Sequence, residues 1–353
     1  MPIKTAMKTN TCAALLSLAL LGAGSVSAQE AKTDPVGFIT LTIAGGGSVT
    51  SPALSLISPT LTRPIAYQGL ITAIAGTTIT VSGTPWAVGA FDGANGNHYV
   101  EIVSTAVPTR SGTMSDITAT PTTSTITTAG DLSVNQAAVG DTVRIRKDVT
   151  IADIFGATNS AGLLASDDAS TADEILIYNG ASFSAYFYYT GTPGFPAGWY
   201  NVSTFEPAGS TPIAPNEAVV IRRKASTPIS LTSVGSVKTG NTIFAVVNGL
   251  NVLGTASAQG LSLDSSGLYT ANENSGVKAT DDAATADEVI LYVGTTQTSY
   301  FYYTGSPGFP AGWYNSASFD PAGAQVIAAG TSFVLKRKGG PSFNWAVPSP
   351  TSF

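Results

Sequence analysis

Two pairs of carboxylates that occur twice in the chain are its best candidates for chemistry. Asp167-Asp168 and Asp173-Glu174 return 114 residues later as Asp281-Asp282 and Asp287-Glu288. Paired carboxylates hydrolyse glycosides when they are held about 5 Å or about 6.5–9.5 Å apart, and carboxylate oxygens also bind calcium. A plainer role for short acids before a strand is to accept hydrogen bonds from nearby backbone N–H groups in turns. We expect this turn role, because the spacing does not follow the ligand order of a calcium loop and a duplicated catalytic pair would imply two active sites.

Histidine, cysteine and nucleotide-binding motifs give no support for catalysis. His98 is the only histidine, and it follows a Gly/Asn-rich stretch, where we expect an exposed turn residue. Cys12 is the only cysteine, so imidazole and thiolate ligands for zinc are too few. The chain also lacks the G-x-S-x-G nucleophile elbow, the phosphate loop and the dinucleotide-binding fingerprint. We therefore predict that the protein is not an enzyme and has no catalytic residue, no metal site and no cofactor.

Aromatic residues form the second duplicated group. The run Tyr186–Tyr189 and the Pro/Gly-rich stretch up to Asn201 are repeated almost letter for letter 114 residues later. Side chains alternate between the two faces of a strand, so both faces of this strand are aromatic, and burial in a core is the default for such side chains. We expect Trp199 and Trp313 to pack under the Pro/Gly turns. The alternative is a platform on which sugar rings stack, and its ligand-binding residues would be Tyr186, Tyr188, Trp199, Tyr200, Tyr300, Tyr302, Trp313 and Tyr314.

The carboxylates and the aromatic residues lie inside one internal duplication. Residues 167–224 align with 281–338 without a gap, and about 33 of the 58 positions are identical. Short β-branched and aromatic runs in each copy predict a meander of strands at the spacing typical of sandwiches and barrels. The predicted strands are Glu174–Tyr178, Tyr186–Tyr189, one starting at Trp199 and Ala218–Arg222 in the first copy, and Glu288–Tyr292, Tyr300–Tyr303, one starting at Trp313 and Phe333–Lys336 in the second. Both copies end in three basic residues, 222–224 and 336–338, which we expect to be solvated strand ends.

The segment before the duplication has the pattern of a separate β domain. Gly69–Ile74 and Thr78–Val81 are apolar and β-branched runs around a short Gly turn, which predicts a hairpin. Val143 and Ile145 alternate with arginines, as in the closing strand of a small barrel. The best helical candidate, Ile151–Asn159, is only a turn or two long. The predicted fold is all-β: an N-terminal β-barrel or sandwich domain, followed by a duplicated β-meander that forms two similar β-sheets or sandwich halves. The predicted boundaries are 1–28 for a signal peptide, 35–147 for the N-terminal domain, 148–226 for the first copy, 227–345 for linking strands and the second copy, and 346–353 for a C-terminal tail.

The first 28 residues have the composition of an export signal. Lys4 and Lys8 precede the apolar run Ala13–Leu21, and Val26-Ser27-Ala28 is a small-residue cleavage site. An N-terminal membrane anchor is the alternative, but this run is shorter than the roughly 20 residues that span a bilayer. We therefore predict no membrane span, and export to the periplasm, the cell surface or the extracellular medium. The net charge of −6 offers no basic surface for nucleic acid.

Several short motifs resemble those of an uncharacterised family of exported bacterial β-rich proteins. The motifs are Pro35-Val36-Gly37-Phe38, Arg63-Pro64 with the Thr78–Trp86 hairpin segment, Thr171-Ala172-Asp173 before a strand, the Tyr-rich strand before a Gly-Trp pair, and the strand of residues 216–224. The resemblance spans most of the chain after the leader. It implies export and a β-rich architecture, and it carries no established activity.

Together these observations predict an exported, non-catalytic β-rich protein that acts as a structural or interaction component of the cell surface or extracellular matrix. Its partners would be polysaccharide or other surface proteins, and nucleic acid is not among them. Two alternatives stay open. One is a glycan-binding module that uses the repeated aromatic strands, and the other is a carboxylate-dependent glycosidase.

Overall fold

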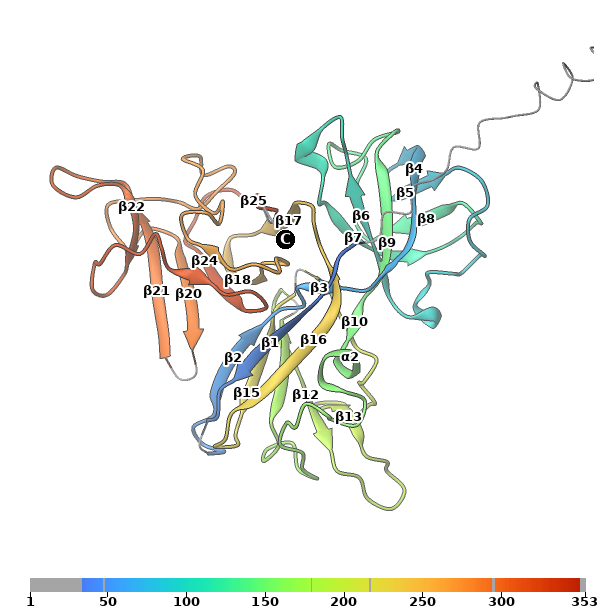
Figure 1. Ribbon diagram of the computed structural model, residues 1–353, viewed down its shortest axis with the longest axis horizontal. Helices are drawn as coiled ribbons and strands as arrows, with labels where there is room; N and C mark the ends of the chain where they lie inside the picture. Colours follow the sequence, from blue (N-terminus) through green and yellow to red (C-terminus); the bar gives the residue numbers. More distant parts are fainter. Residues whose placement is uncertain (1–33, 47, 179, 216, 294–295, 350–353) are drawn as a thin grey trace, which may run out of the picture. The chain divides into compact units, whose positions relative to one another are not determined.

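A computed structural model of the protein describes residues 34–353 apart from 47, 179, 216, 294–295 and 350–353. The predicted signal peptide, 1–28, lies outside the described residues, as does the end of the predicted C-terminal tail. In the described part, strands make up nearly all of the regular structure. The helices found there are α2 (Ile151–Phe155) and two 3-10 turns, η1 (Gly93–Asn95) and η2 (Pro108–Arg110). The all-β prediction is therefore confirmed (Figure 1).

Six strands close into a barrel in the order β4-β5-β8-β7-β6-β9. They are β4 (Ile65–Ala75), β5 (Thr78–Val81), β6 (His98–Val103), β7 (Met114–Ala119), β8 (Thr125–Thr128) and β9 (Thr142–Lys147). The long strand β4 pairs with β9 through its first half and with β5 through its second half, which closes the barrel. Register shifts after Ile65 and Ile71 mark bulges in β4, and bulges let a strand bend around such a closure.

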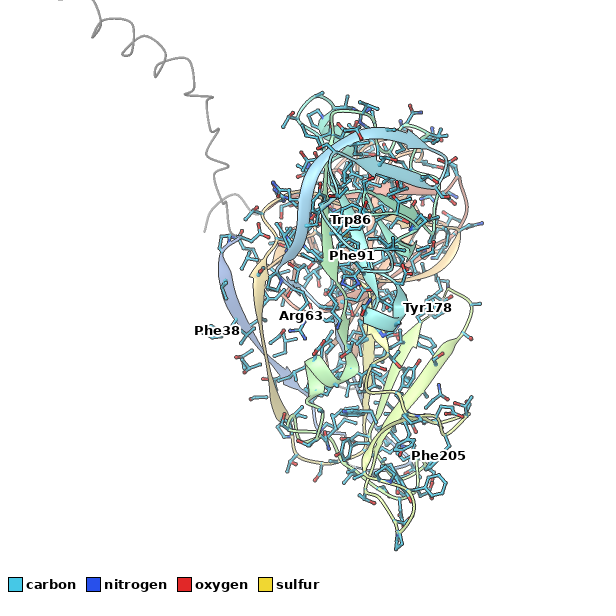
Figure 2. All side chains as sticks on the ribbon, turned by 90° about the vertical axis from the view of Figure 1, so that its right-hand side faces the viewer. Phe38, Arg63, Trp86, Phe91, Tyr178 and Phe205 are labelled. Atoms are coloured by element: carbon cyan, nitrogen blue, oxygen red, sulfur yellow. The ribbon has the colours of Figure 1, made fainter. Side chains whose placement is uncertain are left out.

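The barrel has a hydrophobic core of its own. Ile79 and Ile126 are fully buried in it, and Trp86 packs against Phe91 with ring centroids 5.2 Å apart (Figure 2). His98 opens β6 and is buried, so the prediction of an exposed turn residue is wrong. Its ring lies 5.2 Å from that of Phe91, and burial lowers the pKa of the imidazole.

Each copy of the duplication contains a five-stranded antiparallel sheet with the same strand order. The first sheet runs β13-β12-β11-β15-β2 and the second β22-β21-β20-β24-β18. The strands are β2 (Ala53–Ile57), β11 (Glu174–Tyr178), β12 (Phe183–Tyr189), β13 (Gly198–Asn201) and β15 (Val219–Arg223) in the first sheet, and β18 (Gly249–Gly254), β20 (Glu288–Val293), β21 (Thr296–Tyr303), β22 (Gly312–Asn315) and β24 (Ser332–Arg337) in the second. All the strands predicted inside the two copies are therefore present.

Two- and three-stranded antiparallel sheets complete each copy. In the first, β1 pairs with β16, β16 with β3, and β10 with β14; in the second, β17 pairs with β25 and β19 with β23. These strands are β1 (Val36–Ile43), β3 (Leu61–Thr62), β10 (Val149–Thr150), β14 (Pro212–Ile213), β16 (Ile229–Val237), β17 (Thr242–Val246), β19 (Leu261–Ser262), β23 (Val326–Ile327) and β25 (Phe343–Val347). The linking strands predicted after residue 226 therefore belong to the copies themselves: β16 ends the first copy and β17 begins the second.

The pairing registers show that the barrel is inserted into the first copy. Strand β2 pairs with β15 as β18 pairs with β24, and β1 pairs with β16 as β17 pairs with β25. Strands β1 and β2 are therefore the counterparts of β17 and β18. In the chain, the barrel lies between β1 and β2 on one side and their partners β15 and β16 on the other. Within the predicted N-terminal domain, 35–147, the barrel strands pair among themselves, whereas β1, β2 and β3 pair with β15 and β16.

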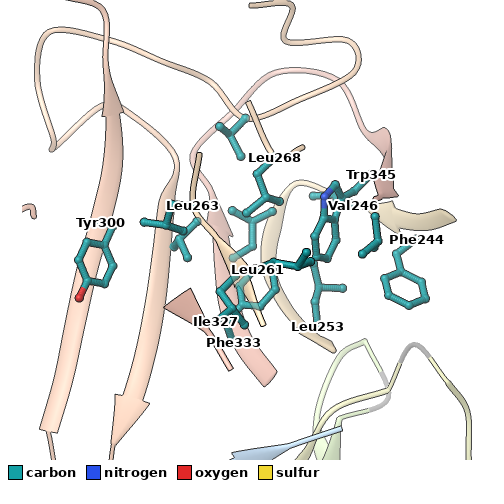
Figure 3. Packing of buried hydrophobic residues seen from close by; sticks show 14 of the residues in the cluster. Phe244, Val246, Leu253, Leu261, Leu263, Leu268, Tyr300, Ile327, Phe333 and Trp345 are labelled. Carbon is teal, nitrogen blue, oxygen red and sulfur yellow. The ribbon is translucent and has the colours of Figure 1, made fainter. Parts of the chain in front are cut away.

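A separate core fills each copy. In the second copy Phe244, Phe333 and Trp345 are at most 2% exposed and pack together (Figure 3). In the first copy α2 supplies Ile151 and Phe155 to the core. A capping box between Thr150 and Asp153 starts that helix. The predicted helix is thus present, but it ends at Phe155 and not at Asn159.

The two sheets also contact each other through a further apolar cluster. Val220 and Leu56 of the first sheet pack with Val334 and Val252 of the second. An isolated bridge joins Ile57 to Thr331, and its counterpart under the duplication joins Glu217 to Leu253. Because each sheet contributes the same positions to these contacts, a pseudo-two-fold axis relates the two sheets.

Candidate functional site

The carboxylates Asp173 and Glu174 hold a buried basic strand end. Asp173 is 1% exposed, and its Oδ2 accepts hydrogen bonds from Arg223 Nη1 at 2.6 Å and from the Leu164 N–H at 2.7 Å. Its Oδ1 accepts a hydrogen bond from the Lys224 N–H, and Glu174 accepts one from Lys224 Nζ at 2.7 Å. Neighbouring strands β11 and β15 bring these charges together. Asp173 thus accepts backbone N–H groups as expected, but it and Glu174 also form buried ion pairs that the turn role did not include. The solvated end predicted for Arg223 and Lys224 is wrong, because both side chains are buried.

The second copy repeats this network. Asp287 accepts hydrogen bonds from Arg337 Nη1 at 2.9 Å and from the Lys338 N–H at 2.7 Å, and Glu288 accepts one from Lys338 Nζ at 2.7 Å. The Arg337 guanidinium also lies 4.7 Å from the centre of the Phe343 ring. A buried carboxylate that is paired with a guanidinium and with backbone N–H groups fits a structural role.

Asp168 and Asp282 do have the predicted turn role. Asp168 Oδ1 accepts a hydrogen bond from the Ser170 N–H at 2.8 Å, and Asp282 Oδ1 accepts one from the Ala284 N–H at 2.8 Å. The hydroxyl and N–H of Ser170 lower the pKa of the exposed Asp168 carboxyl. Across the described residues, no group of three or more His, Cys, Asp or Glu side chains is arranged to hold a metal ion.

The aromatic residues predicted from the sequence lie mainly in cores. Six of them are buried: Tyr186, Trp199, Tyr200, Tyr300, Trp313 and Tyr314. Tyr188 and Tyr302 are partly buried, and each packs edge-to-face against the tryptophan of its copy. These rings therefore support the core interpretation over an open stacking platform.

We expected the two tryptophans to pack under the Pro/Gly turns, but they lie elsewhere. Trp199 Nε1 instead donates a hydrogen bond to the Gly156 carbonyl at 2.8 Å, at the end of α2. The ring below the turn is that of Tyr200, whose hydroxyl donates to the Pro196 carbonyl at 3.0 Å. The two residues are neighbours in β13, so they point to opposite faces of the sheet.

Four phenylalanines that were not predicted form two exposed aromatic patches, one in each copy. The first patch is Phe195 with Phe205, and the second is Phe309 with Phe319. Phe195 and Phe309 are 54% and 53% exposed, and in both patches the two ring centroids are 5.9 Å apart. Phe205 lies among the loops beyond the sheet of the first copy (Figure 2). Contiguous exposed apolar surface of this kind is typical of interaction sites.

The inner ring of each patch is held in an unusual backbone conformation. Phe205 has φ +56° and Phe319 has φ +59°, a left-handed region that bulky residues rarely adopt. The Phe205 ring stacks on Tyr200 at 4.9 Å, and the Phe319 ring stacks on Tyr314 at 4.8 Å. Such conformations cluster at functional sites and persist only where the surroundings impose them. Their occurrence in both copies makes each patch a preformed surface.

The surroundings of the patches define their chemistry. Glu206 and Asp320 follow the inner rings directly and are exposed, so each patch has an acidic rim. The hydroxyls of Tyr200 and Tyr314 donate to the carbonyls of Pro196 and Pro310. These hydroxyls are therefore already occupied. The repeated Gly-Phe-Pro turns and the repeated phenylalanine beyond Asn201 and Asn315 were the sequence signal for this surface.

A third group of carboxylates lies where the barrel meets the first copy. Asp148 follows β9, Asp116 lies on β7, and Glu217 precedes β15. Burial, with the charges of Asp116 and Glu217, raises the pKa of Asp148 to about 7. Asp116 and Glu217 line a hollow of about 260 Å³, and burial raises the pKa of each. Sequence patterns could not indicate this group, because its members come from three distant segments.

No protein-family model, curated protein or solved structure matches the chain. In the described residues, no helix is both long enough and apolar enough to cross a membrane.

Proposed function

We propose that this is an exported, non-catalytic interaction protein that binds a partner on the cell surface or in the extracellular matrix through its two aromatic patches. The observation that carries the proposal is the duplicated pair of exposed phenylalanines over a buried tyrosine. Exposing such rings costs hydrophobic stabilisation in an isolated molecule. An interaction accounts for this arrangement in both copies better than packing does.

The duplicated acids support a non-catalytic role. Asp173 and Asp287 are buried in ion pairs, and Asp168 and Asp282 accept turn hydrogen bonds. A glycosidase would need one carboxyl group to donate a proton and a second to act as base or nucleophile. The ion pairs and turns give both acids of each copy a structural function.

The partner that fits best is a protein surface that is apolar at its centre and basic at its rim. The exposed rings of Phe195 and Phe309 supply the apolar contact, and Glu206 and Asp320 supply complementary charge. Two equivalent patches on one chain would bind a repetitive surface with an avidity above that of either patch alone. A sugar platform is less favoured here, because the hydroxyls of the underlying tyrosines already have partners.

Retention of the protein on intact cells tests this function. The full chain is produced in its native cells, and unpermeabilised cells are probed for it before and after a salt wash. We expect surface retention for the parent, weaker retention for Phe195→Ser and for Phe309→Ser, and the largest loss when both are changed. Because the outer rings contribute little to the cores, the melting temperature should change little.

Phe183→Ser is the matched control. Phe183 is an exposed phenylalanine on β12 outside the patch, and its counterpart in the second copy is Gln297, so it is not duplicated. Its substitution should leave retention unchanged. Equal retention of the double variant and the parent, or a product found only inside the cell, would refute the proposal.

A further inference from the structure

We propose a second binding site, a groove over the outward face of the ribbon β17–β25 that takes a neutral, hydroxyl-rich saccharide chain. Ile243 pairs with Ala346, and Ala245 pairs with Asn344. The residues between them in the strands, such as Trp345, are buried in the core of the second copy. Because side chains alternate between the faces of a strand, these four residues point outward and form the floor of the groove.

Two hollows meet on this floor at Asn344. One, of about 390 Å³, is lined by Ile243, Ala346 and Asn344 together with the barrel segments 108–113 and 135–136. The other, of about 340 Å³, is lined by Ala245 and Asn344 together with residues 274–275 and 342–343. Each volume lies in the range of small-ligand sites. Because Asn344 lines both hollows, a chain that lies across the two strands would contact both of them, whereas a single ring would contact one.

The lining is rich in carboxamides and carries no charged side chain. Asn135, Gln136, Asn241 and Asn344 contribute amide groups, and within the part of the chain that the structure describes none of these amides has a hydrogen-bond partner in the protein. Each amide offers two donors and an acceptor, which matches sugar hydroxyls that both donate and accept. A charged ligand would find no counter-ion in the groove, so a neutral ligand is favoured.

The barrel builds one wall of this groove, which makes the site specific to the second copy. The Ile243 N–H donates to the Gly112 carbonyl at 3.0 Å, which ties β17 to the barrel segment beside the groove. In the first copy the matching face of β1 and β16 carries Thr40, Thr232 and Ser230, and the two threonine hydroxyls bond to each other at 3.0 Å. Ser230 is the counterpart of Asn344 and supplies a matched control.

Titration calorimetry of the full chain tests the assignment. The probes are neutral gluco-oligosaccharides of increasing length, an acidic alginate oligosaccharide of similar length and an extended neutral peptide. We expect affinity for the neutral series to rise with chain length until the groove is filled, and no binding of alginate. Asn344→Leu, which keeps the volume but removes the amide, should weaken binding at least tenfold, whereas Ser230→Leu should leave it unchanged.

The groove and the aromatic patches can be separated in the same assay. The Phe195→Ser, Phe309→Ser double variant should bind the neutral saccharide as the parent does, because its changes lie outside the groove. A parent that binds no neutral saccharide overturns the assignment, as does equal affinity for Asn344→Leu and the parent. Binding of the peptide alone overturns the ligand class. None of these results depends on whether the patches hold the protein on cells.

Discussion

Asp173 and Asp287 show why residue type alone was a poor guide to their role. Both are short acids before a strand, which favours a turn, but in the folded chain each meets an arginine from a strand more than 40 residues later. Burial removes water from these charges, so each carboxylate depends on its protein partners. Exposed Asp168 keeps water as an alternative partner. The two classes of acid should therefore respond differently to the same substitution.

Replacing Asp173 with Ala should lower the free energy of unfolding by about 3–5 kcal/mol, because it leaves the buried Arg223 guanidinium without its carboxylate. Asp287→Ala should cost a similar amount through Arg337. Asp168→Ala should cost much less, because water can replace the turn hydrogen bonds of this fully exposed carboxylate. Urea unfolding followed by tryptophan fluorescence measures all three.

Should Asp173→Ala fail to fold, Asp173→Leu with Arg223→Met should recover most of the loss, because it removes both charges together. Equal small losses for Asp173 and Asp168 would contradict the buried network.

At the scale of elements, strands were predictable and their partners were not. Alternation in Thr78–Val81 and β-branched or aromatic runs such as Tyr186–Tyr189 indicate strands, because local pattern reflects burial on a pleated surface. The pairing of β2 with β15 was not predictable, because the barrel separates them in the chain and no local pattern records a distant partner. The location of the aromatic patches was predictable, because the repeated Gly-Phe-Pro sequences indicate the loops that carry them. Their exposure was not, because only the backbone geometry shows that Phe205 is held outward on Tyr200.

Elements that meet at the junction of the barrel with the first copy should give stability a pH dependence. The folded-state pKa of Asp148 is about 7, above the ordinary value of 3.8, so the folded chain binds the extra proton between these values. The contribution of protonated Asp148 to the free energy of unfolding is therefore fully present below about pH 4 and is lost as the pH rises through 7. The raised pKa values of Asp116 and Glu217 act in the same direction. One such proton gives a slope of up to about 1.4 kcal/mol per pH unit.

Asp148→Asn should flatten that slope and raise stability at pH 8 relative to the parent. Unfolding free energies measured in urea from pH 4 to pH 9 check this. The lowered pKa of His98 works in the opposite direction, because protonation of the buried imidazole destabilises the fold at low pH. The comparison of variant with parent therefore isolates the carboxyl group better than the parent curve alone. Parallel curves for the two proteins would show that Asp148 does not take up a proton in this range.

For the whole molecule, the structure implies a duplicated unit into which a barrel has been inserted. Each copy has its own apolar core, the barrel has another, and the cluster between the two sheets contains no barrel residue. The second copy passes from β18 to β19 through residues 255–260 alone, at the place where the first copy carries the barrel. The ties from the barrel to the rest include ion pairs of Lys238 with Glu101 and of Asp34 with Arg146, and a single barrel side chain, Met114 on β7, packs against the core of the second copy in the described residues.

Deleting residues 65–147 should therefore leave a duplicated unit that still folds. Removal of the barrel exposes Lys238 and Asp34 to water and leaves neither as a buried unpaired charge, so the loss of stability should be modest. Trp199, Trp313 and Trp345 remain in their cores, and the shortened chain should keep blue-shifted fluorescence, dispersed amide resonances and one cooperative transition.

Deleting 174–223 is the converse control. It removes the sheet partner of β2 and opens the first core, so that chain should lose dispersion. If excision of the barrel also abolishes cooperative unfolding, the barrel is part of the folding unit, and the insertion accounts for the order of the strands but not for the stability of the protein.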